Sequence, residues 1–299
     1  MITIKNISKS CGKVEALRDV SLNINQNEIF GLIGPDGAGK TTLMRILVSL
    51  LLPDKGSASM GGVDVVKQYR QIRKIVGYMP GRFSLYHDLS VEENLNFFAS
   101  VFGTTVEANY YLVKDIYQQL EPFKTRRAGK LSGGMKQKLA LSCALIHKPE
   151  VLVLDEPTTG VDAVSRTEFW DMLGKLKQSG ITIFVSTPYM DEASRCDRVA
   201  LIQGGEIMTV DQPARIVEQY GKRIWNVKSA ETYRLLNDLK AWESTTSVYP
   251  FGQYLHLSVD ESTGKEDIIA YMQSQNHEPY VYEGFSIIED VFMDLMGKQ

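Results

Sequence analysis

The sequence predicts an α/β fold in which helices cover a mostly parallel sheet, followed by a smaller α+β domain. Three short apolar runs, at 29–33, 151–154 and 181–185, each end in a polar or glycine-rich turn, as buried parallel strands do. Stretches of helical pattern separate these runs, and such alternation is typical of a parallel sheet. The chain has 299 residues, 43% of them hydrophobic, which is enough for one large and one smaller domain.

The elements of the first part can be placed in order. Alternating residues at 2–4 and 20–24 predict two strands, and a helix is expected from Lys40 to about Leu51. Residues from about 90 to 147 have a helical pattern. Ser90 begins this region, and an acidic residue three positions later gives it the spacing of a capping box. Another helix is predicted to pack on the sheet through apolar residues at helical spacing: Phe169, Met172, Leu173 and Leu176.

After Gly221 the sequence pattern changes to short predicted strands that alternate with predicted helices. We therefore place the core domain at residues 1–221 and a small accessory α+β domain at 222–299. A last helix is expected to begin at Ser286, with Glu289 at the capping-box position. The other predicted elements of this domain are strands at 224–227, 254–259 and 280–282 and helices at 231–240 and 265–274.

Composition and charge exclude several classes of protein. A net charge of −3 and a pI of about 5.9 argue against a nucleic-acid groove, which needs a strongly basic face, so no nucleic-acid partner is predicted. The three cysteines are too widely separated for a metal site and favour a reducing compartment. The longest apolar run, at 47–52, is far shorter than the ~18 residues of a membrane helix. Any membrane role is therefore expected to be indirect.

A glycine-rich segment follows the apolar run 29–33. It fits the P-loop pattern G-x-x-x-x-G-K-[ST], in which glycines and the following helix N-terminus let backbone N–H groups cradle phosphates. Lys40 is expected to reach the β- and γ-phosphates, and the Thr41 hydroxyl to coordinate Mg²⁺. The alternative is a chance glycine turn, but a chance match in this length has a probability on the order of 0.01. The predicted nucleotide-binding residues are Gly34, Pro35, Asp36, Gly37, Ala38, Gly39, Lys40, Thr41 and Thr42.

Two acidic residues follow the apolar run 151–154. Asp155 has the position of a Walker B carboxylate, which would hold Mg²⁺ through water, and Glu156 would polarise the attacking water as the catalytic residue. Alone, such a pair is more often a solvent-exposed turn at a strand end. A P-loop in the same chain reverses that preference.

A second candidate anion site lies at residues 131–135, Leu131-Ser132-Gly133-Gly134-Met135. Small residues and a serine at a helix start expose N–H groups and a hydroxyl that suit an anion, although an ordinary N-cap has the same pattern. Two phosphate cradles in one chain imply a nucleotide that two subunits contact.

With these motifs, residues 1–220 resemble the nucleotide-binding subunits of ABC transporters. The resemblance implies a P-loop NTPase (RecA-like) core with a helical subdomain at about 82–147 and a small antiparallel β region.

The resemblance also implies cofactors and partners. Dimers of this family hold two ATP molecules with Mg²⁺. Each ATP lies between the P-loop of one subunit and the signature segment of the other, which in this chain is 131–135. Leu131 to Met135 would thus face the ATP of a second ATP-binding subunit, in a homodimer or heterodimer, and Asp162 would contact that subunit. The segment 78–95 matches the stretch that couples to an integral-membrane permease made of separate chains. This places the subunit peripherally on the cytoplasmic face of the cell membrane. The segment 289–292 resembles the tail of drug-exporter-type members, although a plain amphipathic helix fits it equally well.

Three positions depart from the family pattern. Gly81 replaces a glutamine that contacts Mg²⁺ and water, Pro188 replaces a histidine that contacts the γ-phosphate, and Cys11 replaces a ring that stacks on adenine. Losing such polar groups weakens transition-state stabilisation more than ATP binding. We therefore expect an ATPase that binds MgATP and hydrolyses it slowly beside a partner with a complete site. In the alternative, Arg82, Tyr189 or a permuted water contact compensates in an active homodimer.

Two further classes of function compete with a transport motor. A soluble ABC protein that acts on ribosomes or DNA commonly carries two cassettes, long coiled-coil insertions or zinc sites, and none of these is visible in the sequence. A non-hydrolysing regulatory ATP-binding subunit of an asymmetric pair is favoured by the three departures. The presence of Glu156 argues against it.

Overall fold

The computed structural model describes residues 1–297 and divides into two compact units, Met1–Gln212 and a second unit that begins at Pro213. The change in sequence pattern predicted the domain boundary after Gly221. The difference is helix α7 (Pro213–Tyr220), which packs against α10 (Ile288–Gly297) of the second unit and buries Ile216. Each unit is described by itself below.

The first unit contains the predicted parallel sheet. Its six strands lie in the order β10-β9-β3-β8-β7-β6, and all neighbours are parallel except β10 and β9. The three apolar runs form β3, β7 and β8 at its centre, which confirms the α/β prediction. The strands are β3 (Ile29–Ile33), β6 (Val76–Met79), β7 (Val151–Asp155), β8 (Thr182–Thr187), β9 (Arg198–Gln203) and β10 (Glu206–Asp211).

A second sheet in this unit is small and antiparallel, with the order β2-β1-β4-β5. Helix α1 (Lys40–Leu47) contacts β2 and β4 of this sheet and β7 of the parallel sheet. The helix ends four residues before Leu51, the predicted end, because Ser49 adopts a left-handed conformation with φ 59°. The strands of the small sheet are β1 (Ile2–Cys11), β2 (Val14–Ile24), β4 (Lys55–Met60) and β5 (Val63–Asp64).

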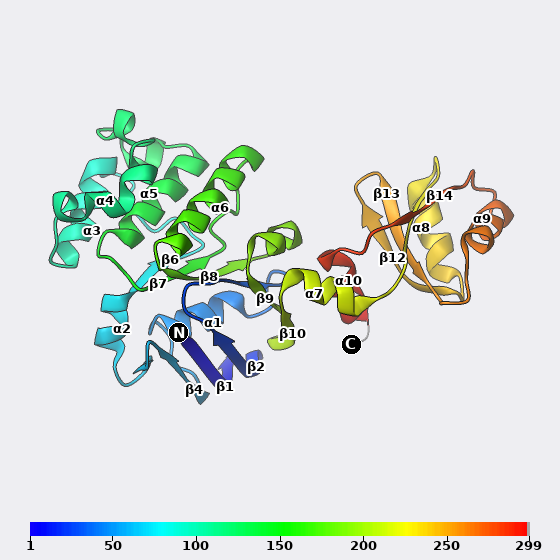
Figure 1. Cartoon of the computed structure of the whole chain (residues 1–299), viewed down its shortest axis with the longest axis horizontal. Helices are drawn as coiled ribbons and strands as arrows, with labels where there is room; N and C mark the ends of the chain where they lie inside the picture. Colours follow the sequence, from blue (N-terminus) through cyan, green and yellow to red (C-terminus); the bar gives the residue numbers. More distant parts are fainter. Residues whose placement is uncertain (298–299) are drawn as a thin grey trace. The chain divides into compact units, whose positions relative to one another are not determined.

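The helical region predicted at 90–147 contains three α-helices that contact one another and lie together in Figure 1. The capping box is confirmed: the Ser90 hydroxyl accepts from the Glu93 N–H, and the Glu93 carboxylate accepts from the Ser90 N–H. The helices of the first unit after α1 are α2 (Tyr69–Ile75), α3 (Val91–Val101), α4 (Val106–Tyr117), α5 (Gly133–Leu145) and α6 (Ala163–Gln178), with short 3₁₀ turns at Glu121–Phe123, Ala128–Lys130 and Met190–Arg195.

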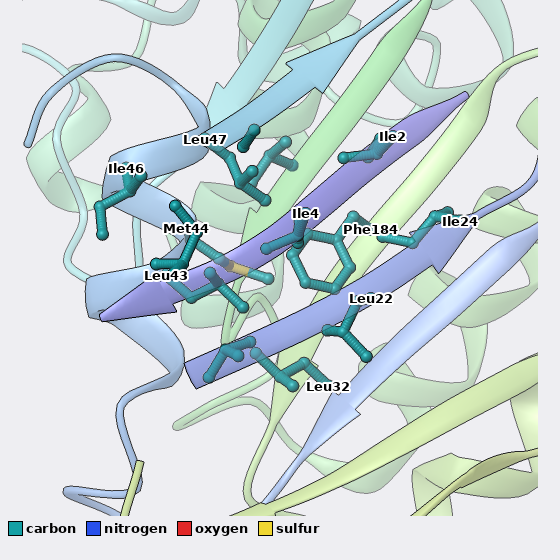
Figure 2. Packing of buried hydrophobic residues seen from close by; sticks show 14 of the residues in the cluster. Ile2, Ile4, Leu22, Ile24, Leu32, Leu43, Met44, Ile46, Leu47 and Phe184 are labelled. Atoms are coloured by element: carbon teal, nitrogen blue, oxygen red, sulfur yellow. The ribbon is translucent and has the colours of Figure 1, made fainter. Parts of the chain in front are cut away.

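One buried apolar cluster joins the two sheets of the first unit through α1. Ile2 and Ile4 of β1, Leu43 and Met44 of α1, and Phe184 of β8 all belong to it and are almost completely buried. Figure 2 shows these side chains pointing toward one another between the elements. This cluster fixes α1, and therefore the loop before α1, against the parallel sheet.

The second unit alternates strands and helices in the order β-α-β-β-α-β between α7 and α10. Its antiparallel sheet has the strand order β12-β13-β11-β14, and α8 and α9 share an apolar core with it. The three predicted strands and both predicted helices are present, and β12 is a strand that the sequence did not indicate. The elements are β11 (Ile224–Lys228), α8 (Thr232–Ala241), β12 (Thr245–Phe251), β13 (Tyr254–Val259), α9 (Lys265–Ser274) and β14 (Tyr280–Gly284).

The start of the last helix differs from the prediction. Helix α10 begins at Ile288, and the Ser286 hydroxyl donates to the Lys222 carbonyl oxygen rather than capping the helix. The cap is Asp290, whose carboxylate accepts from the Ile287 N–H at 2.6 Å. Asp290 is fully buried and also bonds to His256 Nδ1 of β13 at 2.7 Å. A tertiary contact therefore selects Asp290 over Glu289.

The cluster between the sheets predicts a large effect of shortening Phe184. Phe184→Ala leaves a cavity in a fully buried site, so we expect the first unit to lose about 3–5 kcal/mol of unfolding free energy in urea titrations. Val164→Ala on α6 is the control, because Val164 is 70% exposed and should change that free energy by less than about 0.5 kcal/mol. A loss below about 1 kcal/mol for Phe184→Ala would contradict the packing described.

Candidate functional site

The predicted P-loop connects the buried strand β3 to helix α1. A Cβ added to Gly34 would lie 2.1 Å from the Ile202 carbonyl oxygen, and one added to Gly39 would lie 2.4 Å from the Ala16 carbonyl oxygen. Gly39 also has φ 102°, and Gly37 has φ 82°, both in the left-handed region. The backbone therefore passes too close to β2 and β9 for any side chain at positions 34 and 39.

Lys40, the first residue of α1, has its ammonium group inside the loop. The group donates to the carbonyl oxygens of Gly34 at 2.7 Å and Pro35 at 3.0 Å, and lies 3.1 Å from Glu156 Oε1. The side chain is only 3% exposed, so these oxygens and the carboxylate replace most of its water. The ammonium is thus held where an anion bound by the loop would meet it.

Asp155 and Thr41 meet at the carboxyl end of the parallel strands. The Thr41 hydroxyl donates to Asp155 Oδ1 at 3.1 Å, and the Ser186 hydroxyl donates to the same oxygen at 2.8 Å. Asp155 is 2% exposed. A hydroxyl and a buried carboxylate beside a phosphate loop are the hard oxygen donors that Mg²⁺ prefers, together with phosphate oxygens and water. These residues therefore fit Mg²⁺, with Thr41 and Asp155 as the groups that would hold it.

Glu156 follows β7 with a left-handed backbone, φ 50°, which is uncommon for a residue with a side chain. Its N–H donates to the carbonyl oxygen of Ser186 at 3.1 Å and to the Ser186 hydroxyl at 3.0 Å. Ser186 thus positions both acidic residues after β7. Sequence reasoning assigned this serine no role, because nothing in a serine that follows an apolar run indicates that it faces a neighbouring carboxylate.

The structure places two of the three departures at the site. A Cβ at Gly81 would lie 3.0 Å from the Asp155 carbonyl oxygen, so position 81 borders the acidic pair but has no side chain to contribute. Pro188 directly follows β8, whose last residue Thr187 lies beside β3. Proline has neither an N–H nor a polar side chain to offer there.

A buried carboxylate anchors the loop that contains Pro188. Glu192 accepts from the Thr187 hydroxyl at 2.5 Å and from the Thr158 hydroxyl at 2.8 Å, and all three side chains are buried. The Thr187 hydroxyl also accepts from the Tyr189 N–H at 3.0 Å. The loop after β8 is therefore tied to the loop after β7. Sequence reasoning did not single out Glu192, since its partners come from two distant segments.

The signature residues lie at the start of α5, against the loop before α6. Ser132 caps α5 by accepting from the Met135 N–H at 3.4 Å. A Cβ at Gly134 would lie 2.7 Å from Ser165 Oγ, so this glycine permits close packing. Asp162 caps α6 by accepting from the Ser165 N–H at 3.0 Å, and this hydrogen bond lowers the pKa of the Asp162 carboxyl. Ser132 and Asp162 thus have local capping roles, and their contacts with a second subunit stay a prediction.

A cavity of about 330 Å³ lies over the P-loop. Among the described residues, its lining includes none of the signature residues 131–135 and not Cys11, which is exposed at the end of β1. The apolar side of the cavity comes from Val14 and Ala16 of β2. The lining residues are Val14, Glu15, Ala16, Arg18, Gly37, Gly39, Lys40, Thr41, Thr42, Glu156 and Gly204.

A P-loop on a parallel sheet, with an oxygen pair for a cation and a separate glycine-rich helix start, defines a nucleotide-binding cassette. The family model described as ABC transporter matches residues 17–159. Nod factor export ATP-binding protein I of Burkholderia lata is 34% identical over 302 residues, which cover 100% of this chain and 97% of that protein. The chain belongs to the ABC transporter ATP-binding proteins.

Another relative is longer than this chain. It is the probable multidrug ABC transporter ATP-binding protein YbhF of Escherichia coli K12, which is 37% identical over 303 residues. The matched region covers 99% of this chain and 52% of YbhF, so the chain spans about half the length of that relative.

Solved structures agree with the fold of the first unit. An ATP-binding subunit of an ABC transporter has 26% identity and a TM-score of 0.67, and the match covers 74% of this chain and 93% of that chain. The dimeric ATP-binding cassette MJ0796, bound to ADP and Pi, has 25% identity and a TM-score of 0.64, with 71% and 98% coverage. The predicted P-loop NTPase core is thereby confirmed as an ABC cassette fold.

Within residues 1–297, no helix is both long and apolar enough to cross a membrane.

The close approach at Gly34 predicts that a single methyl group disrupts the P-loop. Gly34→Ala should weaken MgATP binding by about tenfold or more, because its Cβ would overlap the Ile202 carbonyl oxygen and displace the loop. The measurement is the ATP-dependent shift of the thermal unfolding midpoint.

Gly174→Ala is the matched control for this variant. Gly174 lies within α6, has no heavy atom within 4 Å of an added Cβ, and is not among the lining residues of the P-loop cavity. Alanine there should leave ATP affinity unchanged and stabilise the helix by about 0.5–1 kcal/mol. Equal ATP affinities of Gly34→Ala and the wild type would contradict the claim that the close contact between Gly34 and the Ile202 carbonyl oxygen leaves no room for a side chain.

Proposed function

We propose that this chain is the ATP-binding subunit of an ABC export transporter, which binds MgATP at a dimer interface and powers export through a separate membrane permease. The observation that carries the proposal is the meeting of three groups at the carboxyl edge of the sheet: the Lys40 ammonium, the Thr41 hydroxyl and the Asp155 carboxylate. Lys40 supplies positive charge for the β- and γ-phosphates. Thr41 and Asp155 would hold Mg²⁺, which when bound neutralises charge on the phosphate oxygens.

The position of the signature supports a site shared by two subunits. Ser132, Gly133 and Gly134 do not line the chain's own P-loop cavity, so a second ATP-binding subunit is needed to bring a signature to that cavity. Asp162 follows Gly160, whose carbonyl oxygen lies beside the signature, and it is expected to face the second subunit. The related cassette MJ0796 forms a dimer. ATP binding would then favour the closed dimer over the open one.

Export is supported by the relatives. YbhF is described as a probable multidrug transporter component, and the Burkholderia protein as a Nod factor export component. In this chain, the tail segment that resembles drug-exporter-type members, 289–292, lies in α10, where Val291 and Phe292 are buried. The segment 78–95 is expected to couple to the permease, which places the subunit on the cytoplasmic face of the membrane.

We further propose that this chain hydrolyses ATP slowly at its own P-loop. Glu156 is present and would polarise the attacking water, but positions 81 and 188 offer it no polar side chain to help orient that water. ATP binding relies on the loop backbone, Lys40 and Thr41, and none of these depends on the two missing groups. The chain would then be the slow half of an asymmetric pair, and its signature would serve a partner with a complete site. If the chain hydrolyses no ATP at all, it would be a regulatory ATP-binding subunit of that pair.

Steady-state ATP hydrolysis by the purified chain tests this proposal, with Lys40→Ala as the blank. We expect a rate near that of the blank, while MgATP still raises the thermal unfolding midpoint. The double substitution Gly81→Gln with Pro188→His should raise the rate about tenfold or more, since one lost donor commonly costs roughly 100- to 1000-fold. Glu156→Gln in the double variant should abolish the gain.

A wild-type rate clearly above the blank would contradict slow hydrolysis and indicate that Arg82, Tyr189 or a water compensates in a homodimer. The asymmetric pair is tested separately, in a stoichiometric mixture with the partner subunit. If Lys40→Ala abolishes the activity of the mixture and Ser132→Ala does not, the signature of this chain serves no partner site.

A further inference from the structure

The cavity over the P-loop has two ends with different chemistry. At one end, the loop residues 37–42 bring backbone N–H groups, the Lys40 ammonium and the Thr41 hydroxyl, which suit a triphosphate and Mg²⁺. The other end is formed by β2 and by Gly204, in the turn between β9 and β10. Because the phosphates occupy the loop end, the ribose and the base are left to lie over this second end. Its β2 residues are Val14, Glu15, Ala16 and Arg18.

The base end has no ring on which a base could stack, since no aromatic side chain is among the described lining residues of the cavity. Cys11 of β1 pairs directly with Val14 of β2, and side chains of directly opposed residues in an antiparallel pair are neighbours. A ring at position 11 would therefore lie beside the exposed Val14. The exposed Cys11 thiol offers no such surface, so the stacking energy that aromatic rings give to bases is missing here.

The charged side chains of the base end are paired with each other. Arg18 Nε lies 3.2 Å from Glu15 Oε2, and Arg18 Nη1 lies 3.5 Å from Glu206 Oε1. The other described residues of this end have aliphatic side chains or none. Adenine carries an amino group where guanine carries a carbonyl oxygen, and a site separates two such ligands best by hydrogen bonds to the group that differs. No side chain of this end is placed to make that distinction.

We propose that this site recognises the triphosphate with its Mg²⁺ and not the base, so that the chain binds GTP about as tightly as ATP. The inference rests on the proposed function, because it takes the P-loop cavity as the nucleotide site, and it adds the range of nucleotides that the site accepts. Lys40, Thr41 and Asp155 act on parts that ATP and GTP share. The aliphatic wall meets the same fused rings in both purines, and apolar contact is not directional.

Direct titration of the full chain tests base selectivity. Isothermal calorimetry with MgATP and with MgGTP gives the two Kd values, and Lys40→Ala is the blank for binding outside the P-loop. We expect the two Kd values to agree within about fivefold, because neither base gains a hydrogen bond that the other lacks. A larger preference for ATP would overturn the inference.

Adding a ring at position 11 tests the base end by a gain of affinity. Cys11→Tyr should lower the Kd of ATP and of GTP by about fivefold or more, because every base has a face on which a ring can stack. The ratio of the two Kd values should stay near that of the wild type. Tyrosine suits an exposed strand position, so the variant should fold. Cys11→Ser is the matched control, since it replaces the thiol without adding a ring, and it should bind like the wild type.

The outcomes separate this inference from the proposed function. If neither nucleotide binds the wild type better than the Lys40→Ala blank, the proposed function fails and the inference fails with it. If Cys11→Tyr leaves both Kd values unchanged, the base does not lie beside Val14, and the inference alone is overturned. A GTP preference above about fivefold that Arg18→Ala removes would also overturn it. That result would show that Arg18 leaves its exposed ion pair with Glu15 and binds the guanine edge.

Discussion

A single buried carboxylate, that of Asp155, organises the candidate site. A charged group that is 2% exposed is costly unless hydrogen bonds replace its water, and two hydroxyls donate to its Oδ1. One of them belongs to Thr41 of α1 and the other to Ser186 of β8. The carboxylate therefore joins three elements that are far apart in the chain. The same serine hydroxyl accepts from the N–H of Glu156 and so fixes the residue proposed to act on water.

Close backbone packing provides the second constraint, and it acts on the P-loop from outside. The carbonyl oxygens of Ile202 and Ala16 leave no room for side chains at Gly34 and Gly39. The loop is thus held between β9 and β2 before any ligand contributes. From within, the Lys40 ammonium binds two loop carbonyl oxygens and Glu156. The phosphate cradle is therefore largely pre-organised by the protein, which lowers the ordering cost of binding.

Local patterns in the sequence predicted much of this architecture. Apolar runs predicted β3, β7 and β8, and short spacing rules predicted the P-loop and the Ser90 cap, because each depends on neighbours in the chain. The sequence could not reveal contacts between distant segments. Examples are the Glu192 carboxylate between Thr158 and Thr187, and Asp290, which caps α10 while it bonds to His256. In both cases a polar residue looks ordinary until the fold brings its partners to it.

Position 81 joins the acidic pair to the segment that follows β6. Gly81 lies two residues after the end of β6, and a Cβ there would lie 3.0 Å from the Asp155 carbonyl oxygen. Position 81 lies within the segment 78–95 that is proposed to couple to the permease, so a movement of that segment would shift position 81 relative to the acidic pair. A glutamine at that position could transmit the movement through its side chain to the bound nucleotide. Glycine can transmit it only through the backbone, so partner docking and water positioning would be less tightly coupled here. In the slow subunit proposed above, the same glycine would thus also loosen the control of hydrolysis by the permease.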